Sequence, residues 1–304
     1  MPGPSPPIRP VSGSRKWATV PPFVPSVIVT HSVAQRILSA NRVLGLLCLL
    51  GLSGLSGLLS GCASPGDVAT VQRLVPRVLA EHPHDPTAFT QGLEVVDGHL
   101  WESTGIYGES TLRVVDRATG RLLGSVALDP GLFGEGLTAL GDGRILQLTW
   151  KAGRALVWEA ATLERSAVWA FGGQGWGVCR LDDDTLVMSD GSATLTFRDV
   201  DGFARSGGVE IHLDGEPVDR LNELECVDGT VWANIWQADR IVAINPASGR
   251  VTVVVDASGL PVDRSGLGSD DVLNGIAHDA STGRFLLTGK RWPTLFEVEF
   301  VPEA

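Results

Sequence analysis

The residues best suited to chemistry stand at the start and end of five similar segments of the chain. The segments begin at Gln91, Glu135, Trp176, Asn222 and Asn274, and each continues as an apolar run, a turn and a second apolar run. The second runs end, in the same order, at Gly105, Trp150, Asp190 or Gly191, Trp236 and Lys290. A carboxylate can move a proton, amide and ammonium groups can stabilise a developing negative charge, and indoles can form an apolar wall. These residue types could therefore combine proton transfer with stabilisation of an oxyanion, if the fold gathers them.

The spacing of the five segments predicts the scaffold. Their first residues are 44, 41, 46 and 52 positions apart, and a period of ~40–50 residues with several short strands per repeat is typical of a β-propeller. Two further strand-like runs, such as "LRVVDRATGRLLGSVAL", follow in the first four repeats. The fifth repeat lacks a strand, so we expect residues 74–84 to pair with the C-terminal "TLFEVEFV" and close the ring. The sequence thus predicts an all-β fold, a five-bladed β-propeller closed by pairing of its N- and C-terminal strands.

Propeller geometry would bring the candidate residues to one place. The first strand of each blade lines the central channel and the second runs antiparallel to it, so the start of one and the end of the other share a rim. We expect the acid, the amides, the lysine and three tryptophans at this rim. A structural salt bridge between Glu135 and Lys290 is the alternative, and Gln91 and Asn222 could merely satisfy backbone groups. The remaining tryptophans of the first four repeats are expected to pack between blades: Trp101, Trp158, Trp169 and Trp232.

Residues 1–61 are expected to be an N-terminal extension with a lipoprotein signal peptide. Arg36 and Arg42 precede the apolar run "VLGLLCLLGLSGLSGLLSGCAS", which ends in small residues. Its Leu-Ser-Gly-Cys resembles a bacterial lipobox, in which Cys62 would be acylated and become the mature N-terminus. Ordinary signal cleavage and an uncleaved anchor are the alternatives, although Gly and Ser within the run argue against a spanning helix. The long leading region suggests that the true start codon lies further along.

This signal sets the expected domain organisation and location. Residues 62–73 would be a tether, and residues 74–304 the catalytic propeller. The protein would be an exported lipoprotein of the cell envelope, at the outer membrane or cell surface, and would meet the membrane only through its lipid anchor.

Charge and cysteine content limit the partners. The chain has 24 Lys and Arg against 35 Asp and Glu, a net charge of −11, and five of the basic residues but no acidic one precede Cys62. The exported part is thus strongly acidic, which opposes binding to nucleic acid or to an anionic membrane surface. Cys179 and Cys226 stand in apolar strand-like runs and are expected to be buried free thiols rather than a disulfide. The two histidines of "HPHDP" are a weak metal signal without partner ligands.

A series of segments resembles the plant and bacterial type of glutaminyl-peptide cyclotransferase. In order, from about residue 78 to residue 300, they include "HDPTAFTQGL", "FGEGLT", "QLTWK", "LNELE", "ANIWQADRI", "LNGIAHD" and "GKRWPTLFEV". That family has a five-bladed propeller and converts the N-terminal glutamine of peptides to pyroglutamate with release of ammonia. The resemblance implies that Glu135 is the acid/base, supported by Gln91, Asn222 and Lys290. It also implies a substrate pocket of Trp150, Trp176 and Trp236, to which the fifth leading residue, Asn274, is expected to contribute.

Two other functions stay open from the sequence. A metal-dependent propeller hydrolase of the lactonase type could use Glu135, Asn222, Asn274 and an Asp as Ca²⁺ ligands, although such enzymes usually have six blades. A non-catalytic lipoprotein that binds a partner is the other. The cyclotransferase itself is expected to act as a monomer on peptide or protein N-terminal Gln. Its chemistry would need no cofactor, and a structural Ca²⁺ in the channel is compatible with it.

Overall fold

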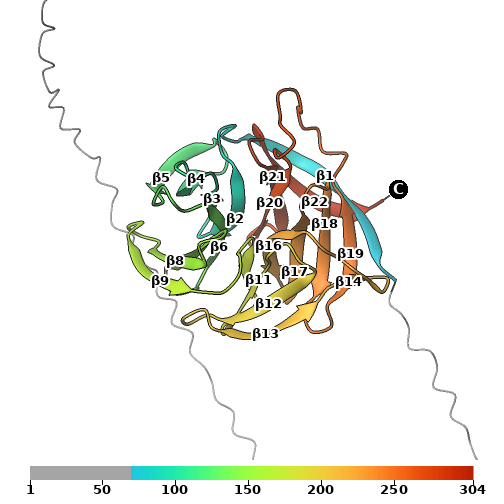
Figure 1. Cartoon of the computed structure of the whole chain (residues 1–304). Coiled ribbons are helices and arrows are strands. Elements are labelled where there is room, and N and C mark those ends of the chain that lie inside the picture. Colours follow the sequence, from blue (N-terminus) through green and yellow to red (C-terminus); the bar gives the residue numbers. More distant parts are fainter. Residues whose placement is uncertain (1–69, 304) are drawn as a thin grey trace, which may run out of the picture. The chain divides into compact units, whose positions relative to one another are not determined.

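The computed structural model describes residues 70–303, and its regular elements are all β-strands. The strands form three separate four-stranded sheets and one ten-stranded sheet. Figure 1 shows the sheets around a common centre, with β2, β6, β16 and β20 near the middle and β5, β9 and β13 at the periphery. In this range no helix is long and apolar enough to cross a membrane.

Each four-stranded sheet is a meander in which consecutive strands are antiparallel neighbours. The first sheet consists of β2 (Thr90–Val96), β3 (His99–Thr104), β4 (Thr111–Asp116) and β5 (Arg121–Ala127). The second consists of β6 (Gly134–Ala139), β7 (Arg144–Thr149), β8 (Arg154–Glu159) and β9 (Arg165–Ala170). The third consists of β10 (Val178–Arg180), β11 (Thr185–Met188), β12 (Thr194–Asp199) and β13 (Arg205–Glu210).

The ten-stranded sheet contains two more meanders, which β1 joins. The fourth meander is β16 (Leu221–Val227), β17 (Thr230–Ile235), β18 (Arg240–Asn245) and β19 (Arg250–Asp256). The last contains β20 (Leu273–Asp279), β21 (Arg284–Gly289) and β22 (Thr294–Pro302). A small hairpin of β14 (His212–Leu213) and β15 (Glu216–Pro217) is attached to β19.

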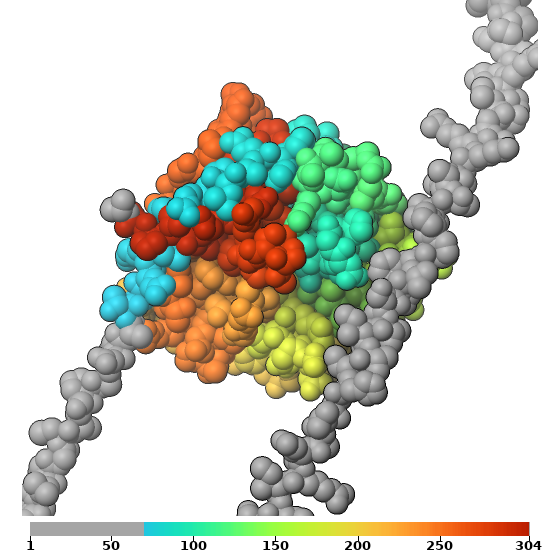
Figure 2. All heavy atoms as spheres, turned by 180° about the vertical axis from the view of Figure 1, so that it is seen from behind, coloured from blue at the N-terminus to red at the C-terminus, as the bar shows by residue number. Residues whose placement is uncertain are grey.

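Strand β1 (Gln72–Pro83) provides the strand that the last meander lacks. It runs antiparallel to β22 from Leu74 opposite Pro302 to Pro83 opposite Thr294, and parallel to β19 on its other side. The predicted pairing of the two terminal segments is confirmed, with β1 beginning two residues earlier than expected. Figure 2 shows the two segments side by side on the surface, β1 in cyan and β22 in dark red.

The inner strands are irregular at the predicted leading residues. In β2 and β6 the register with the next strand shifts across Gln91 and across Glu135, and in β16 and β20 it shifts across Asn222 and Asn274. Such bulges interrupt the ladder and redirect side chains. The four polar residues therefore lie at the points where the inner strands depart from regular alternation.

Glycines beside these residues allow the inner strands to approach closely. A methyl group on Gly92 would lie 2.5 Å from the backbone nitrogen of Leu137, and one on Gly136 would lie 2.7 Å from Cα of Gly177. A methyl group on Gly177 would collide with the carbonyl oxygen of Asn222. The recurring Gly-Leu of the repeats is thus explained by contact between the backbones of neighbouring sheets.

The fourth repeat has Glu223 where the first three have these glycines. Its carboxylate accepts hydrogen bonds from the backbone nitrogens of Leu93, at 3.2 Å, and Ile276, at 2.9 Å. Burial raises the pKa of Glu223 well above its usual range, against the effect of the two hydrogen bonds. One side chain thereby links the inner strands β16, β2 and β20.

Apolar clusters fill the spaces between neighbouring meanders. Trp101 and Trp158 belong to the cluster between the first and second sheets, Trp169 packs against the next, and Trp232 stacks on Phe300 with ring centroids 5.2 Å apart. These four tryptophans are therefore packing residues, as predicted. A further cluster joins the last meander to the first sheet through Leu93, Leu100, Ala277, Leu286 and Leu295.

Cys179 and Cys226 form a disulfide, so the prediction of free thiols is wrong. Strands β10 and β16 are neighbouring inner strands, and their Cα atoms at these two positions are 5.4 Å apart, within the usual range for a disulfide. The prediction considered each cysteine within its own apolar run and did not ask which inner strands are neighbours.

Replacing both cysteines by alanine should lower the free energy of unfolding by about 2–4 kcal/mol. The cross-link joins residues 47 positions apart and so restricts a long loop in the unfolded chain. Urea unfolding with and without reductant measures the effect. Reductant should bring the wild type to the value of the double variant and leave the variant unchanged; equal stabilities under oxidising conditions would contradict the expectation.

Candidate active site

A cavity of about 310 Å³ brings together residues from all five repeats. Its lining consists of Phe89, Gln91, Ile106, Phe133, Glu135, Trp150, Trp176, Asn222, Trp236, Asp270 and Lys290. Seven of the eight residues predicted for catalysis and substrate binding are in this lining, although they are far apart along the chain. The eighth is Asn274, and the predicted lipidation residue, Cys62, lies outside the described residues.

Polar groups lie at the buried end of the cavity and aromatic groups nearer its rim. Gln91, Glu135, Asn222 and Lys290 are each at most 4% exposed. Trp150, Trp236 and Ile106 are half-buried, and Asp270 is exposed. A ligand that reaches the polar groups must therefore pass an aromatic and apolar opening.

Asn274 lies behind the cavity rather than in its wall. Its Nδ2 donates hydrogen bonds to the carbonyl oxygen of Thr90, at 3.0 Å, and to Oε1 of Gln91, at 3.3 Å. The expected contact of Asn274 with substrate is thus replaced by a contact with Gln91. Because Oε1 of Gln91 accepts this bond, its Nε2 is left as a donor for a ligand.

The charges of Glu135 and Lys290 are close but do not form a salt bridge. No ion pair within 4.0 Å joins them in the described part of the chain. Burial raises the pKa of Glu135 well above its usual range, against the effect of the nearby Lys290 charge. Burial likewise lowers the pKa of Lys290, against the charges of Glu135, Asp270 and Asp271. A desolvated carboxylate of raised pKa is suited to accept and return a proton near neutral pH.

Contacts among the aromatic residues fix the walls. The rings of Trp176 and Trp236 meet edge to face with centroids 5.6 Å apart. Trp150 donates its Nε1 hydrogen bond to Oε1 of Gln174 at 2.8 Å. A methyl group on Gly191 would lie 2.7 Å from the ring of Trp176, so glycine makes room for this indole. The walls are therefore set by packing before any substrate enters.

Comparisons with known proteins agree with this arrangement. The sequence model of the glutamine cyclotransferase family matches residues 53–300. The chain belongs to the glutamine cyclotransferase family. A glutaminyl-peptide cyclotransferase of Arabidopsis thaliana is 38% identical over 226 residues, which cover 73% of this chain and 70% of that protein. The crystal structure of Myxococcus xanthus glutaminyl cyclase is similar with a TM-score of 0.73 and 39% identity, covering 77% of this chain and 100% of that chain. The repeated, propeller-like sheets of this family member are thus similar to those of a glutaminyl cyclase.

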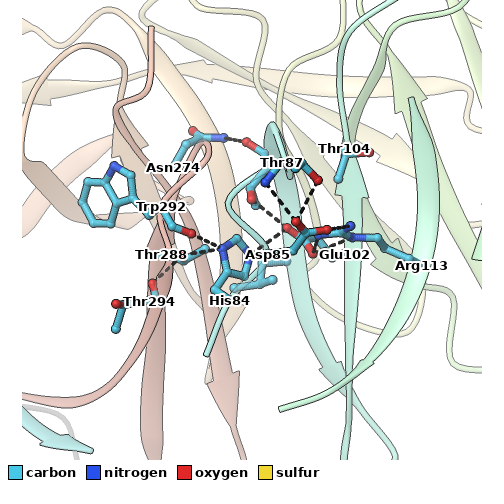
Figure 3. A network of polar contacts seen from close by, with 12 residues as sticks. His84, Asp85, Thr87, Glu102, Thr104, Arg113, Asn274, Thr288, Trp292 and Thr294 are labelled. Atoms are coloured by element: carbon cyan, nitrogen blue, oxygen red, sulfur yellow. Dashed lines mark hydrogen bonds and ion pairs between the residues drawn. The ribbon is translucent and has the colours of Figure 1, made fainter. Parts of the chain in front are cut away.

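A buried ionic network beside the cavity was missed by the sequence analysis. His84 places Nδ1 2.6 Å from the carbonyl oxygen of Trp292 and Nε2 3.0 Å from Oε1 of Glu102. Figure 3 shows the imidazole between these two groups. A carbonyl and an ionised carboxylate only accept hydrogen bonds, so both ring nitrogens carry hydrogen and His84 is an imidazolium.

Opposite charges balance within this network. Glu102 is fully buried and also accepts hydrogen bonds from Oγ1 of Thr90 at 2.7 Å and from Nε of Arg113 at 2.8 Å. Arg113 in turn donates a hydrogen bond from Nη1 to Oδ2 of Asp85 at 2.8 Å. Burial by itself lowers the pKa of His84, but Glu102 and the Trp292 carbonyl outweigh it and raise that pKa. Burial by itself raises the pKa of Glu102, but His84, Arg113 and Thr90 bring it down to about 2.

The network holds two segments that carry cavity residues. Thr90 directly precedes Gln91, and Trp292 lies two positions after Lys290. Between them, the backbone nitrogen of Arg291 donates to the carbonyl oxygen of Ala88 at 2.6 Å. The signal in the sequence was the pair of charges that interrupt the apolar runs "HLWEST" and "TLRVVD".

Replacing His84 by Gln should lower the free energy of unfolding by about 3 kcal/mol at pH 6, because it leaves Glu102 buried without one of its cations. The folded-state pKa of His84 is raised. Its contribution to the free energy of unfolding is therefore complete below pH ~6.5 and declines as the pH rises through the folded-state pKa. The difference in the free energy of unfolding between wild type and variant should therefore become smaller at alkaline pH. Urea unfolding at pH 6 and pH 9 measures this.

The matched control is His82→Gln, since His82 is only partly buried and pairs with Glu297 at 3.2 Å. It should cost under about 1 kcal/mol. If the loss of unfolding free energy caused by His84→Gln stays constant with pH, the assignment of His84 as an imidazolium is contradicted.

Proposed function

We propose that this chain is a glutaminyl-peptide cyclotransferase, which converts the N-terminal glutamine of a peptide or protein to pyroglutamate and releases ammonia. The observation that carries the proposal is the unpaired, desolvated Glu135 beside Gln91, Asn222 and Lys290, at the buried end of an aromatic cavity in a chain of this family. At about 310 Å³ the cavity is at the small end of ligand pockets. That size suits one glutamine residue entering from the end of a peptide.

The substrate closes the ring with its own atoms, and the enzyme assists by transferring a proton. The α-amine nitrogen attacks the side-chain carboxamide carbon, and because both groups belong to one residue the step is intramolecular. An α-amine titrates near ~8, so part of it is neutral at pH 7. Ionised Glu135 accepts the proton of the attacking nitrogen and gives it to the departing nitrogen. The carbon–nitrogen bond of the carboxamide then breaks, ammonia leaves, and Glu135 is ionised again without consumption of water.

The other polar groups stabilise the carboxamide oxygen as it gains negative charge. Lys290 supplies an ammonium group, and Gln91 and Asn222 supply amide hydrogens. One such donor contributes about 2.7–4 kcal/mol in other enzymes. The indoles of Trp150, Trp176 and Trp236 form the apolar wall that accepts an uncharged glutamine side chain.

We also infer a five-bladed propeller closed by its two terminal strands. The clusters between consecutive meanders are followed by one that joins the last meander to the first sheet, so the described sheets follow one another around a ring. Strand β1 then completes the last meander as its fourth strand by pairing with β22. The parallel contact of β1 with β19 makes two blades count as one ten-stranded sheet.

For the segment outside the described residues we propose export and lipid anchoring. Residues 1–61 would be removed as extension and signal, and Cys62 acylated, with a tether that ends at β1. The disulfide between Cys179 and Cys226 supports an oxidising compartment outside the cytoplasm. We further propose that the enzyme acts as a monomer without a cofactor in its chemistry, while a structural Ca²⁺ in the channel is compatible with it.

Replacing Glu135 by Gln should lower kcat for ammonia release from Gln-Ala by about 10²–10⁴-fold with the fold retained, because the amide cannot carry the proton. The matched control is Glu94→Gln, a carboxylate outside the cavity lining that accepts the backbone hydrogen bond of Ala139 at 2.8 Å. Circular dichroism checks the fold of both variants. Full activity of Glu135→Gln would exclude this mechanism. Turnover of Gln-Ala by the wild type that survives EDTA would speak against the metal-dependent hydrolase.

The pH dependence of kcat/KM should show both cavity charges. Glu135 must be ionised to accept a proton, and its raised pKa places the acid limb above the ~4.3 of an ordinary glutamate. Lys290 must be protonated to stabilise the oxyanion, and its lowered pKa places the alkaline limb below ~10.4. Initial rates from pH 4 to pH 11, with kcat/KM divided by the neutral fraction of the substrate's α-amine, measure both limbs. An acid limb near the ordinary glutamate value would contradict the proposed role of Glu135.

A further inference from the structure

The loop between β3 and β4 contains a strained residue in the cavity wall. Ile106 has a φ of 85°, a region that β-branched residues rarely adopt and that costs about 1–3 kcal/mol. Its side chain lines the cavity that contains Glu135. Backbone strain of this kind is kept where the surrounding structure holds it, and it is concentrated at functional sites.

Hydrogen bonds hold Ile106 in this conformation and join it to β6. Its carbonyl oxygen accepts bonds from the backbone nitrogens of Glu109 and Ser110, at 3.0 and 2.9 Å, and from Oγ of Ser110 at 2.8 Å. The same Oγ accepts a bond from the backbone nitrogen of Gly134 at 3.0 Å. Because Gly134 directly precedes Glu135, the strained loop is built onto the strand that carries the acid.

An aromatic surface extends from this loop out of the cavity. The ring of Phe133 lies 5.4 Å from that of Tyr107 and 5.5 Å from that of Trp150, centroid to centroid. Gly105 permits this packing, since a methyl group there would collide with the ring of Phe133. Tyr107 is 51% exposed, so its ring reaches the surface. The apolar wall is therefore continuous from the half-buried Ile106 to the surface.

The route of the substrate leads past this wall. Under the proposed function, on which this route rests, the glutamine carboxamide reacts at the buried polar end. The rest of the peptide must then leave through the opening, and its second residue has its Cα only ~3.8 Å from that of the glutamine. The side chain of this second residue consequently lies at the depth of the half-buried lining residues, Ile106, Trp150 and Trp236.

We propose that Ile106, Tyr107 and Trp150 form a subsite that binds a large apolar side chain at the second position of the substrate. The strained backbone of Ile106 directs its side chain into the cavity wall, and the ring of Phe133, in the same wall, meets the rings of Tyr107 and Trp150 edge to face.

The test compares substrates of the form Gln-Xaa-Ala in which Xaa is Gly, Leu, Phe or Asp. The wild type should turn over the Leu and Phe peptides with kcat/KM about tenfold above that of the Gly peptide, and the Asp peptide, whose side chain is not apolar, should show no such gain. Ile106→Gly and Ile106→Asn both suit a positive φ. In each, the ratio of kcat/KM for Leu over Gly should fall to about twofold or less. Tyr107→Ala, at an exposed position, should lower the ratio of Phe over Gly.

Folding is checked by thermal unfolding, in which Ile106→Gly should match or exceed the wild type because it relieves the strain. Asp97→Gly is the matched control, an exposed non-glycine with a φ of 51° outside the cavity. Its activity and its ratios should equal those of the wild type.

Two outcomes would overturn the subsite while the proposed function stands: equal wild-type rates for all four peptides, or ratios unchanged in all three subsite variants. A wild type that releases no ammonia from any of these peptides would overturn the proposed function, and the subsite with it.

Discussion

The close approach of the inner strands is the constraint on which the site depends. Gly92, Gly136 and Gly177 leave no side chain between neighbouring backbones, so the residues directly before them converge on one small cavity. Bulges at Gln91 and Glu135 then turn the polar groups out of the regular ladder. A larger residue at any of these glycines would separate the sheets and move Glu135 away from the amide and ammonium groups that share its cavity, although it touches no substrate itself.

Burial has opposite consequences for the two groups of charges at this end of the molecule. Glu135 lies among indoles without a hydrogen bond in the described structure, and its pKa is raised so that it can exchange a proton. Glu102 is at least as buried, but His84, Arg113 and Thr90 satisfy it, and its pKa falls to about 2. The first carboxylate is left reactive, whereas the second is neutralised by partners and serves as a rigid support.

Sequence reasoning succeeded where the repeat itself carried the information. Aligning the repeats placed Glu135, Lys290 and three tryptophans at equivalent ends of strands, and these meet in the cavity. It failed for contacts between repeats, which no period encodes. The bond of Asn274 to Gln91, the disulfide of Cys179 with Cys226, and the ion pair of His84 with Glu102 all depend on which elements face one another.

The pairing of β1 with β22 has a consequence for how the molecule is made. Arg77 and Glu299, which form an ion pair across these strands, are 222 positions apart along the chain. The chain is synthesised from its N-terminus, so β1 is made early. The edge that pairs with β22 therefore stays unpaired until nearly all other strands have been synthesised. Completion of the last meander thus depends on its most distant contact, and the edge of β1 is open to pairing with other chains until β22 is available.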